Sequence, residues 1–312
     1  MEFDYIIIGA GSAGCVVANR ITSVDGNKVL LLEAGPKNTA LSLKIPAAIL
    51  SNLTSTKHNW AFQGEPEPEL NDRTLKHDRG KTLGGSSSIN GLVFIRGHAL
   101  DFDGWQQAGC TGWGFADVLP YFKKMETYKG GTDEYRGRDG PLHVHRSTPE
   151  DPLSVAFLQA GKEAGYPETN DISGYRQEGF GGFDRTVFKG ERWSTARAYL
   201  DPIRHRQNLK IQTNTQVQRL LFEGTRATGV IYKDKNGVSQ IVEAKKEIIL
   251  SAGAVGSPHL LMLSGVGPAH HIQKNGVDLV KNIPGVGQNL NDHPDFVLKY
   301  KCKQPVSFWP KT

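Results

Sequence analysis

The sequence predicts an α/β fold that begins with a Rossmann-like dinucleotide-binding unit. A run of β-prone residues, 5–8, leads directly into the pattern G-x-G-x-x-G at residues 9–14, and an Ala/Val-rich helical stretch follows. A second apolar strand, residues 28–32, ends at the acidic Glu33. A glycine-rich turn between a strand and a helix, with an acidic residue about 20 positions later, is typical of proteins that bind a dinucleotide.

Each part of this unit has a physical role in such binding. Gly9 allows the tight turn, Gly11 has no Cβ and lets the backbone approach a pyrophosphate, and Gly14 lets the helix pack closely on the strand. The helix predicted at residues 13–23 directs its free N–H groups and positive dipole end at that pyrophosphate. Glu33 ends the second strand and is placed to accept hydrogen bonds from ribose hydroxyls. These residues alone do not distinguish NAD from FAD.

A second glycine-rich segment, Gly-Gly-Ser-Ser-Ser at residues 84–88, favours one kind of dinucleotide. Leu83 precedes it and the apolar residues 92–95 follow it, so we interpret it as a buried, ordered turn and not as a flexible linker. Such a turn exposes its backbone and can lie against a flat ring system and its phosphates. Its N–H and hydroxyl groups supply hydrogen-bond donors.

The remaining periodic segments predict further helices and strands of an α/β domain. Helices are predicted at residues 152–164 and 194–200, and strands at residues 209–213, 217–222, 230–232, 239–242 and 247–253. The pair Asn236-Gly237 predicts a hairpin turn. Trp105 and Trp113 stand beside glycines, and we interpret them as residues that fill gaps in the packing.

The composition argues against several other classes of protein. The formal net charge is +5 and the isoelectric point is about 9.0, but Lys and Arg are scattered and no nucleic-acid-binding motif is present. We interpret the basic balance as a solvated surface with a mild attraction for anionic lipid. Cys15, Cys110 and Cys302 lie far apart, which predicts neither a disulfide framework nor a metal site and favours a reducing compartment.

The hydropathy of the chain also bears on its location. The N-terminus enters a predicted core strand within five residues, which leaves no room for a signal peptide. No apolar run approaches the ~20 residues needed to span a bilayer. We therefore expect a cytoplasmic protein that can associate peripherally with the inner face of the membrane.

Three ordered motifs resemble those of one enzyme family. Residues 80–90 read GKTLGGSSSIN, residues 253–267 read GAVGSPHLLMLSGVG, and residues 285–293 read GVGQNLNDH. In this order they resemble the glucose–methanol–choline (GMC) oxidoreductase family of flavoproteins. The resemblance implies a GMC-type FAD-binding domain with FAD as its cofactor. It also implies an activity on the CH–OH group of an alcohol.

The resemblance implies a discontinuous arrangement of domains. Residues 1–155 and 194–294 correspond to the FAD-binding domain, and residues 156–193 and 295–312 to portions of a substrate-binding domain that is incomplete here. In the family, a His with a second His or Asn handles the proton of the alcohol from the C-terminal part of the chain. That segment is not among these residues, so we assign no catalytic residue. The chain is then either a fragment of a longer gene product or a truncated protein.

The histidines in this sequence do not replace that pair. His143, His145, His270 and His271 stand in loop-like or surface-like contexts, where a solvated side chain is the ordinary state.

The resemblance also assigns cofactor-binding residues. They are Gly9, Gly11, Ser12, Ala13, Gly14, Glu33, Ala34, Leu83, Gly85, Asn90, Gly91, Leu92, Val93, Val217, Ala252 and Gly253. Ile89 stands where some choline-oxidising members carry a His that tethers the flavin. We therefore expect FAD to be bound without a covalent link.

The substrate assignment has two interpretations. Asp295 stands where choline-oxidising members place an acidic residue near the trimethylammonium group, and a carboxylate there would balance a permanent cation. Alternatively, Asp295 belongs to an ordinary turn of loop-forming residues. Residues 59–62, 97–101 and 300–307 look most like those of choline-oxidising members, which favours oxidation of choline to betaine aldehyde.

Other functions stay open from the sequence alone. The chain is alternatively another alcohol or sugar dehydrogenase or oxidase of the family, or a flavin-binding fragment without catalysis. The electron acceptor is unassigned.

Overall fold

The computed structural model describes residues 2–293, 297, 299, 301–303 and 306. These residues form two compact units. Unit 1 contains residues 1–91 and 190–291, and unit 2 contains residues 92–189 and 292–312. By compactness, therefore, residues 92–155 group with unit 2, whereas the sequence analysis assigned them to the FAD-binding domain. The expected FAD-binding domain is defined by the cofactor that it binds, and the compact units do not test this. Its bounds therefore stay a prediction.

Unit 1 is built on a six-stranded sheet with the order β12-β2-β1-β15-β14-β13. Its parallel half consists of β12 (Leu209–Gln212), β2 (Val29–Leu32), β1 (Phe3–Ile8) and the second half of β15 (Ser239–Leu250). Ile6, Ile7 and all four residues of β2 are buried. Strands of a parallel sheet that are covered on both faces are apolar along their whole length, as these central strands are.

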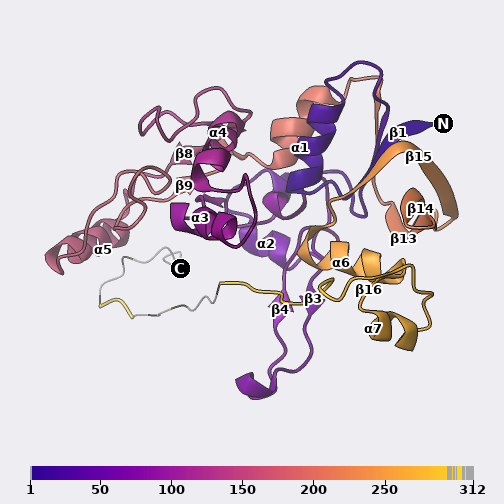
Figure 1. The fold of residues 1–312 in the computed structure, drawn as a ribbon. Helices are drawn as coiled ribbons and strands as arrows, with labels where there is room; N and C mark the ends of the chain where they lie inside the picture. Colours follow the sequence, from indigo (N-terminus) through magenta and orange to yellow (C-terminus); the bar gives the residue numbers. More distant parts are fainter. Residues whose placement is uncertain (1, 294–296, 298, 300, 304–305, 307–312) are drawn as a thin grey trace. The chain divides into compact units, whose positions relative to one another are not determined.

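The antiparallel half of the sheet contains β13 (Gln216–Glu223), β14 (Arg226–Lys233) and the first half of β15. Figure 1 shows these three strands together beside β1. Gly237, with a φ of +79°, lies in the hairpin turn that joins β14 to β15, as the Asn-Gly pair predicts. The prediction of separate strands at 239–242 and 247–253 is wrong, because β15 is continuous from Ser239 to Leu250.

Helix α1 (Ser12–Ile21) packs on this sheet through small residues on its inner face. Gly14, Cys15 and Ala18 of α1 are buried. The strand and helix therefore follow each other as the glycine pattern predicts.

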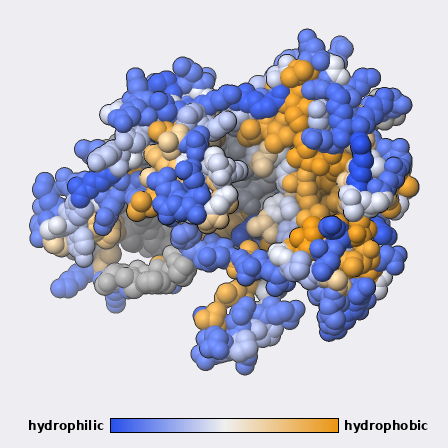
Figure 2. Space-filling view, in the orientation of Figure 1, coloured by the Kyte–Doolittle hydropathy of each residue, from blue (hydrophilic) through white to orange (hydrophobic). Residues whose placement is uncertain are grey.

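Unit 1 also contains further short elements. They are η1 (Leu41–Leu43), α2 (Ile49–Leu53), β3 (Phe62–Gln63), η2 (Pro68–Leu70), β4 (Lys76–His77), η3 (Gly85–Ser88), β11 (Glu191–Arg192), the π-helix η4 (Ala196–Leu200), η5 (Asp201–Ile203), α6 (Gly253–Leu263), β16 (Val266–Gly267), α7 (Ala269–Lys274) and β17 (Lys281–Asn282). Figure 2 shows apolar residues gathered along α1 and α6.

Unit 2 has short elements and few apolar core residues. Its strands are β5 (Val93–Phe94), β6 (Glu126–Thr127), β7 (Leu142–His143), β8 (His145–Arg146), β9 (Asp184–Arg185) and β10 (Val187–Phe188), and its helices are α3 (Ala99–Gln107), α4 (Phe115–Met125) and α5 (Pro152–Glu163). Helix α5 confirms the prediction at 152–164. Trp105 and Trp113 pack on each other with ring centroids 6.3 Å apart, but each is about half exposed.

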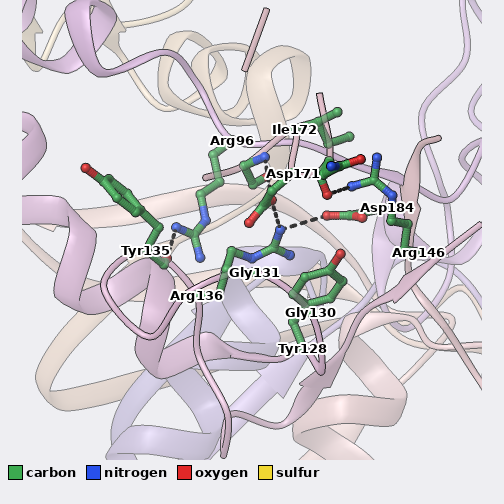
Figure 3. A network of polar contacts seen from close by, with 12 residues as sticks. Arg96, Tyr128, Gly130, Gly131, Tyr135, Arg136, Arg146, Asp171, Ile172 and Asp184 are labelled. Atoms are coloured by element: carbon green, nitrogen blue, oxygen red, sulfur yellow. Dashed lines mark hydrogen bonds and ion pairs between the residues drawn. The ribbon is translucent and has the colours of Figure 1, made fainter. Parts of the chain in front are cut away.

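A buried ionic network occupies the interior of unit 2 (Figure 3). Arg136 is the centre, and its guanidinium pairs with Glu126 at 2.8 Å, Asp184 at 2.9 Å and Asp171 at 2.5 Å. Arg96 also pairs with Glu126, at 2.7 Å. These side chains come from segments far apart in the sequence, so the network ties those segments together.

Candidate dinucleotide-binding site

The carboxyl ends of the parallel strands meet at one edge of the unit 1 sheet. Gly9 follows β1, Glu33 follows β2 and Ser251 follows β15. In register, Ile8 pairs with Leu32 on one side and with Leu250 on the other. This edge is where parallel α/β sheets bind their ligands, and it brings together the predicted residues Gly9, Glu33 and Ala252.

Two glycines of the first motif are required by the packing of the chain itself. Gly9 has a φ of +93°, and a Cβ on it would lie 2.5 Å from the carbonyl oxygen of Ser251. A Cβ on Gly14 would lie 2.0 Å from the carbonyl oxygen of Gly9. Any larger residue at either position therefore displaces backbone.

The middle glycine has a different environment. A Cβ on Gly11 would approach only the Ser251 carbonyl oxygen, at 4.0 Å. Gly11 is the N-cap of α1, no side chain caps this helix, and its first turn carries no acidic residue. Ser12 and Ala13, which open the helix, are exposed. The open backbone and the helix N-terminus fit an anionic pyrophosphate.

The glycine–serine turn lies directly on the first glycine motif. The N–H of Gly84 donates to the carbonyl oxygen of Ala10 at 2.7 Å. A Cβ on Gly85 would lie 2.7 Å from the Cα of Gly11. Gly84 and Gly85 have φ values of +91° and +53°, so both are in the left-handed region that favours glycine. Two motifs separated by about seventy residues therefore form one structure.

Two of the three serine hydroxyls of this turn donate to its own backbone and not outward, as was expected of them. The Ser87 hydroxyl donates to the carbonyl oxygen of Gly84 at 2.6 Å, and the Ser88 hydroxyl donates to that of Leu83 at 2.8 Å. The Ser86 hydroxyl accepts from the N–H of Gly80 at 3.0 Å. Short serine side chains compete for nearby backbone groups, and here they stabilise the turn internally.

Glu33 is held by the backbone on both sides of the site. One carboxylate oxygen accepts from the N–H of Ala10 at 2.9 Å and the other from the N–H of Gly35 at 2.8 Å. Burial raises the pKa of Glu33 to about 7, although these two hydrogen bonds act in the opposite direction. Each oxygen keeps a second lone pair that can accept from a hydroxyl.

The other predicted cofactor residues are distributed over both units. Leu83 is fully buried, Asn90 and Gly91 are exposed, and Val217 packs against the core of the unit 1 sheet. Ala34 and Ala252 are half-buried, and Gly253 is open, with a φ of +83°.

Leu92 and Val93 lie at the start of unit 2. Val93 and Ile95 are about half exposed, whereas Gly85 and Ser88 of the turn that they follow are buried. The substrate candidate Asp295 lies outside the described residues.

Sequence reasoning missed Arg192. This arginine is fully buried, and its Nη1 donates to the backbone and side-chain oxygens of Asn90 at 2.8 and 2.9 Å. Its only signal in the sequence is its position just before Trp193-Ser194-Thr195, and Thr195 bonds Ser87 of the glycine–serine turn at 2.9 Å.

The histidines of the described part have structural roles or remain exposed. His98 caps α3 by accepting from the N–H of Leu100 at 3.2 Å. His143 stacks on Phe188 with ring centroids 3.7 Å apart. Within residues 2–293 and the few described beyond them, no group of three His, Cys, Asp or Glu side chains could hold a metal ion. None of the helices described there is long and apolar enough to cross a membrane.

Curated relatives of the chain are choline dehydrogenases. The chain is 49% identical to the mitochondrial choline dehydrogenase of Mus musculus over 313 residues, which cover 98% of this chain and 52% of the mouse protein. It is 47% identical to the oxygen-dependent choline dehydrogenase of Sinorhizobium fredii, with 99% of this chain and 56% of that protein covered. The chain therefore spans about half the length of the curated relatives it matches.

Solved structures and a family profile agree with these relatives. Pyridoxine 4-oxidase from Mesorbium loti superposes with a TM-score of 0.84 at 33% identity, covering 91% of this chain and 56% of that one. An FAD-dependent oxidoreductase from Chaetomium thermophilum gives 0.85 at 32% identity, covering 93% and 52%. The profile described as GMC oxidoreductase matches residues 3–295. The chain belongs to the GMC oxidoreductase family.

Proposed function

We propose that the protein is part of an FAD-dependent oxidoreductase that oxidises choline to betaine aldehyde at the CH–OH group. The observation that carries this proposal is that the glycine–serine turn packs directly on the first glycine motif, where Gly84 and Gly85 contact the backbone of residues 10 and 11. Membership of the GMC family implies FAD. The identity of 47–50% with choline dehydrogenases favours choline as the alcohol.

We propose that unit 1 supplies the groups that hold the adenine dinucleotide part of FAD. Gly11 and the N-terminus of α1 receive the pyrophosphate, and Glu33 accepts from the ribose hydroxyls. The turn around Gly85, with Asn90 and Gly91, lies against the flavin. FAD, when bound, supplies the acceptor for the hydride of the alcohol.

The flavin is proposed to be bound without a covalent link. Ile89 is 1% exposed and its side chain has no atom that can attack the flavin ring. Acid precipitation of the purified protein should therefore release all the flavin into the supernatant. Flavin that stays in the washed pellet would contradict this attachment.

We propose that the proton of the alcohol is handled by residues outside this sequence. Among the described residues, none of the histidines is assigned to proton transfer. The proposed division into an FAD-binding domain, residues 1–155 and 194–294, and a substrate-binding domain, residues 156–193 and 295–312, agrees with this view. The 312 residues alone should then show no choline-dependent dye reduction, because loss of a positioned base typically removes about 10²–10⁴-fold of the rate. Robust turnover would contradict it.

Asp295 is proposed as the partner of the trimethylammonium group of choline. In the full-length protein, Asp295→Ala should raise KM for choline by about ten- to a hundredfold, because a charge pair is lost. The change should be much smaller for 3,3-dimethylbutanol, which has the same shape without the charge. Asp292→Ala, three residues earlier, is the matched control. Equal effects of Asp295→Ala on both alcohols would remove Asp295 from the substrate site.

The same assay tests the alternative within the family. If another alcohol is the substrate, the full-length protein will prefer it over choline in kcat/KM. A fragment that only binds flavin will reduce no dye with any alcohol. The electron acceptor stays open. A cytoplasmic location is proposed because the three scattered cysteines favour a reducing compartment, and peripheral membrane contact because the chain is basic.

A further inference from the structure

Arg192 of unit 1 is a fully buried cation that has no acidic partner among the described residues. Its side chain is 0% exposed, and burial, opposed by no neighbouring charge, lowers its pKa to about 10. Arg136 of unit 2 is equally buried but contacts three carboxylates. A buried charge is costly unless it is paired, so Arg192 requires an explanation that Arg136 does not.

The side chain of Arg192 makes its hydrogen bonds to Ser87 of the glycine–serine turn and to Asn90 just after it. Its Nη1 donates to the carbonyl and side-chain oxygens of Asn90 at 2.8 and 2.9 Å and approaches the carbonyl oxygen of Ser87 at 3.4 Å. Its Nε and Nη2 have no hydrogen-bond partner in the part of the chain that the structure describes. Among the described residues, the guanidinium therefore holds only the segment from Ser87 to Asn90.

The bond to Asn90 sets the direction of the next N–H group. In a trans peptide the C=O and the following N–H point in opposite directions, and the described chain has no cis peptide. Because the Asn90 carbonyl faces Arg192, the N–H of Gly91 is directed away from it. Gly91 is exposed, a Cβ on it would meet nothing within 4 Å, and its N–H has no partner among the described residues.

We propose that Arg192 is a positioning residue that fixes the Asn90–Gly91 peptide so that the Gly91 N–H donates to the bound flavin. This inference rests on the proposed function, which places the flavin against this turn. The buried charge also polarises the peptide that it binds, and linked hydrogen bonds strengthen one another. A donor held in advance in a site of low polarity stabilises negative charge on its acceptor. Arg192 thus favours the reduced flavin without contacting it.

The test compares three variants of the full-length, flavin-free protein by FAD titration. Arg192→Met removes the donors and should raise the Kd of FAD by about 10- to 100-fold. Arg192→Lys keeps one charged donor and should recover part of this loss. The reduction potential of the flavin that remains bound should fall in Arg192→Met, which a loss of general stability does not cause.

Arg206→Met is the matched control. The Nη1 of Arg206 donates to the Asn19 carbonyl oxygen and the Thr22 hydroxyl, both at 2.8 Å, away from the turn. This variant should lower the unfolding temperature and leave the Kd within about twofold. An unchanged Kd in Arg192→Met, or an equal rise in Arg206→Met, would overturn the proposal. If Arg192→Met does not fold, Arg192→Lys is compared with wild type instead. An unchanged Kd and an unchanged reduction potential in Arg192→Lys would then overturn the proposal.

A measurement without flavin separates this inference from the proposed function. Amide hydrogen exchange of peptides that span residues 84–91 reports the order of the turn in the flavin-free protein. Exchange should be faster in Arg192→Met than in wild type and unchanged in Arg206→Met. If wild type binds no FAD, the proposed function fails, while faster exchange still supports the role of Arg192 in the turn. Identical exchange in wild type and Arg192→Met overturns the inference.

Discussion

Gly11 and Gly14 belong to one sequence motif, but the structure gives them different constraints. A Cβ on Gly14 would collide with the backbone of Gly9 at 2.0 Å, whereas a Cβ on Gly11 would meet only a carbonyl oxygen at 4.0 Å. Gly14 is therefore required for the fold. Gly11 is required only if a ligand approaches its backbone.

This difference gives a paired prediction. Gly11→Ala should have a free energy of unfolding within about 1 kcal/mol of wild type. It should bind FAD at least about 100-fold more weakly, because its methyl group would lie where we propose that the pyrophosphate binds. Gly14→Ala should lose at least about 1–3 kcal/mol of stability because it overpacks the helix against the strand. Denaturant unfolding and FAD titration measure the two effects. A Gly11→Ala protein that binds FAD like wild type would contradict the assignment.

Glu33 gives a prediction about pH. Its pKa in the folded protein, about 7, is above the ordinary value of 4.5, so the folded state binds this proton more tightly. The resulting stability is fully present below pH 4.5 and is lost as pH rises through 7. It amounts to about 3 kcal/mol.

Glu33→Gln should remove this decline in the free energy of unfolding of the flavin-free protein. Glu223→Gln, at an exposed site of β13, should retain it. Parallel stability profiles for wild type and Glu33→Gln between pH 4.5 and 7 would show that Glu33 is not the group responsible.

Among single residues, the sequence predicted those whose place depends on neighbouring segments of the chain. Gly9, Gly14 and Glu33 lie where the motif requires them, because strand, turn and helix are neighbours in the chain. Arg192 was missed because its partner Asn90 lies 102 residues away. The hydroxyls of Ser87 and Ser88 were expected to serve a ligand, but carbonyl oxygens three and five residues earlier accept their hydrogen bonds.

Among the elements, β15 was predicted in two pieces because residues 243–247 are mostly charged. The structure continues the strand through them, because the first half of β15 pairs with β14 and the second half with β1. The charged side chains there are largely exposed. Pairing with the neighbouring strand β14 and the distant strand β1 therefore outweighs local polarity.

The ionic network of unit 2 gives a prediction at the same scale (Figure 3). Burial lowers the pKa of Arg136, but its bonds to Glu126 and Asp184 and the charge of Asp171 outweigh burial and raise it above the ordinary value. Arg136→Met should therefore cost about 3–5 kcal/mol, because it leaves buried carboxylates without their partner. Hydrogen exchange and urea unfolding of unit 2 measure this loss.

Lys162→Met is the control for that loss. It breaks an exposed ion pair with Glu168 at 3.4 Å and should cost no more than about 1 kcal/mol. Equal losses in Lys162→Met and Arg136→Met would mean that the network does not hold unit 2 together.

In the whole molecule, the two units are stabilised by different means, and this decided what the sequence could predict. Unit 1 has an apolar core formed mainly by the strands of its sheet. The order of its elements could therefore be predicted from the hydropathy of the sequence and the positions of its glycines. The interior of unit 2 contains paired charges from positions 10 to 48 residues apart, and no local pattern indicates which of these charges are buried. The compact units consequently differ from the domains expected from the sequence.

The central claim, a flavoprotein that oxidises choline, is tested most directly by the visible absorption spectrum of the purified full-length protein before and after anaerobic addition of choline. The account predicts the bands of oxidised flavin before the addition and their loss afterwards, while 3,3-dimethylbutanol at the same concentration bleaches them more slowly. A protein that lacks flavin bands and binds no added FAD, or whose bands choline leaves unchanged, would contradict it.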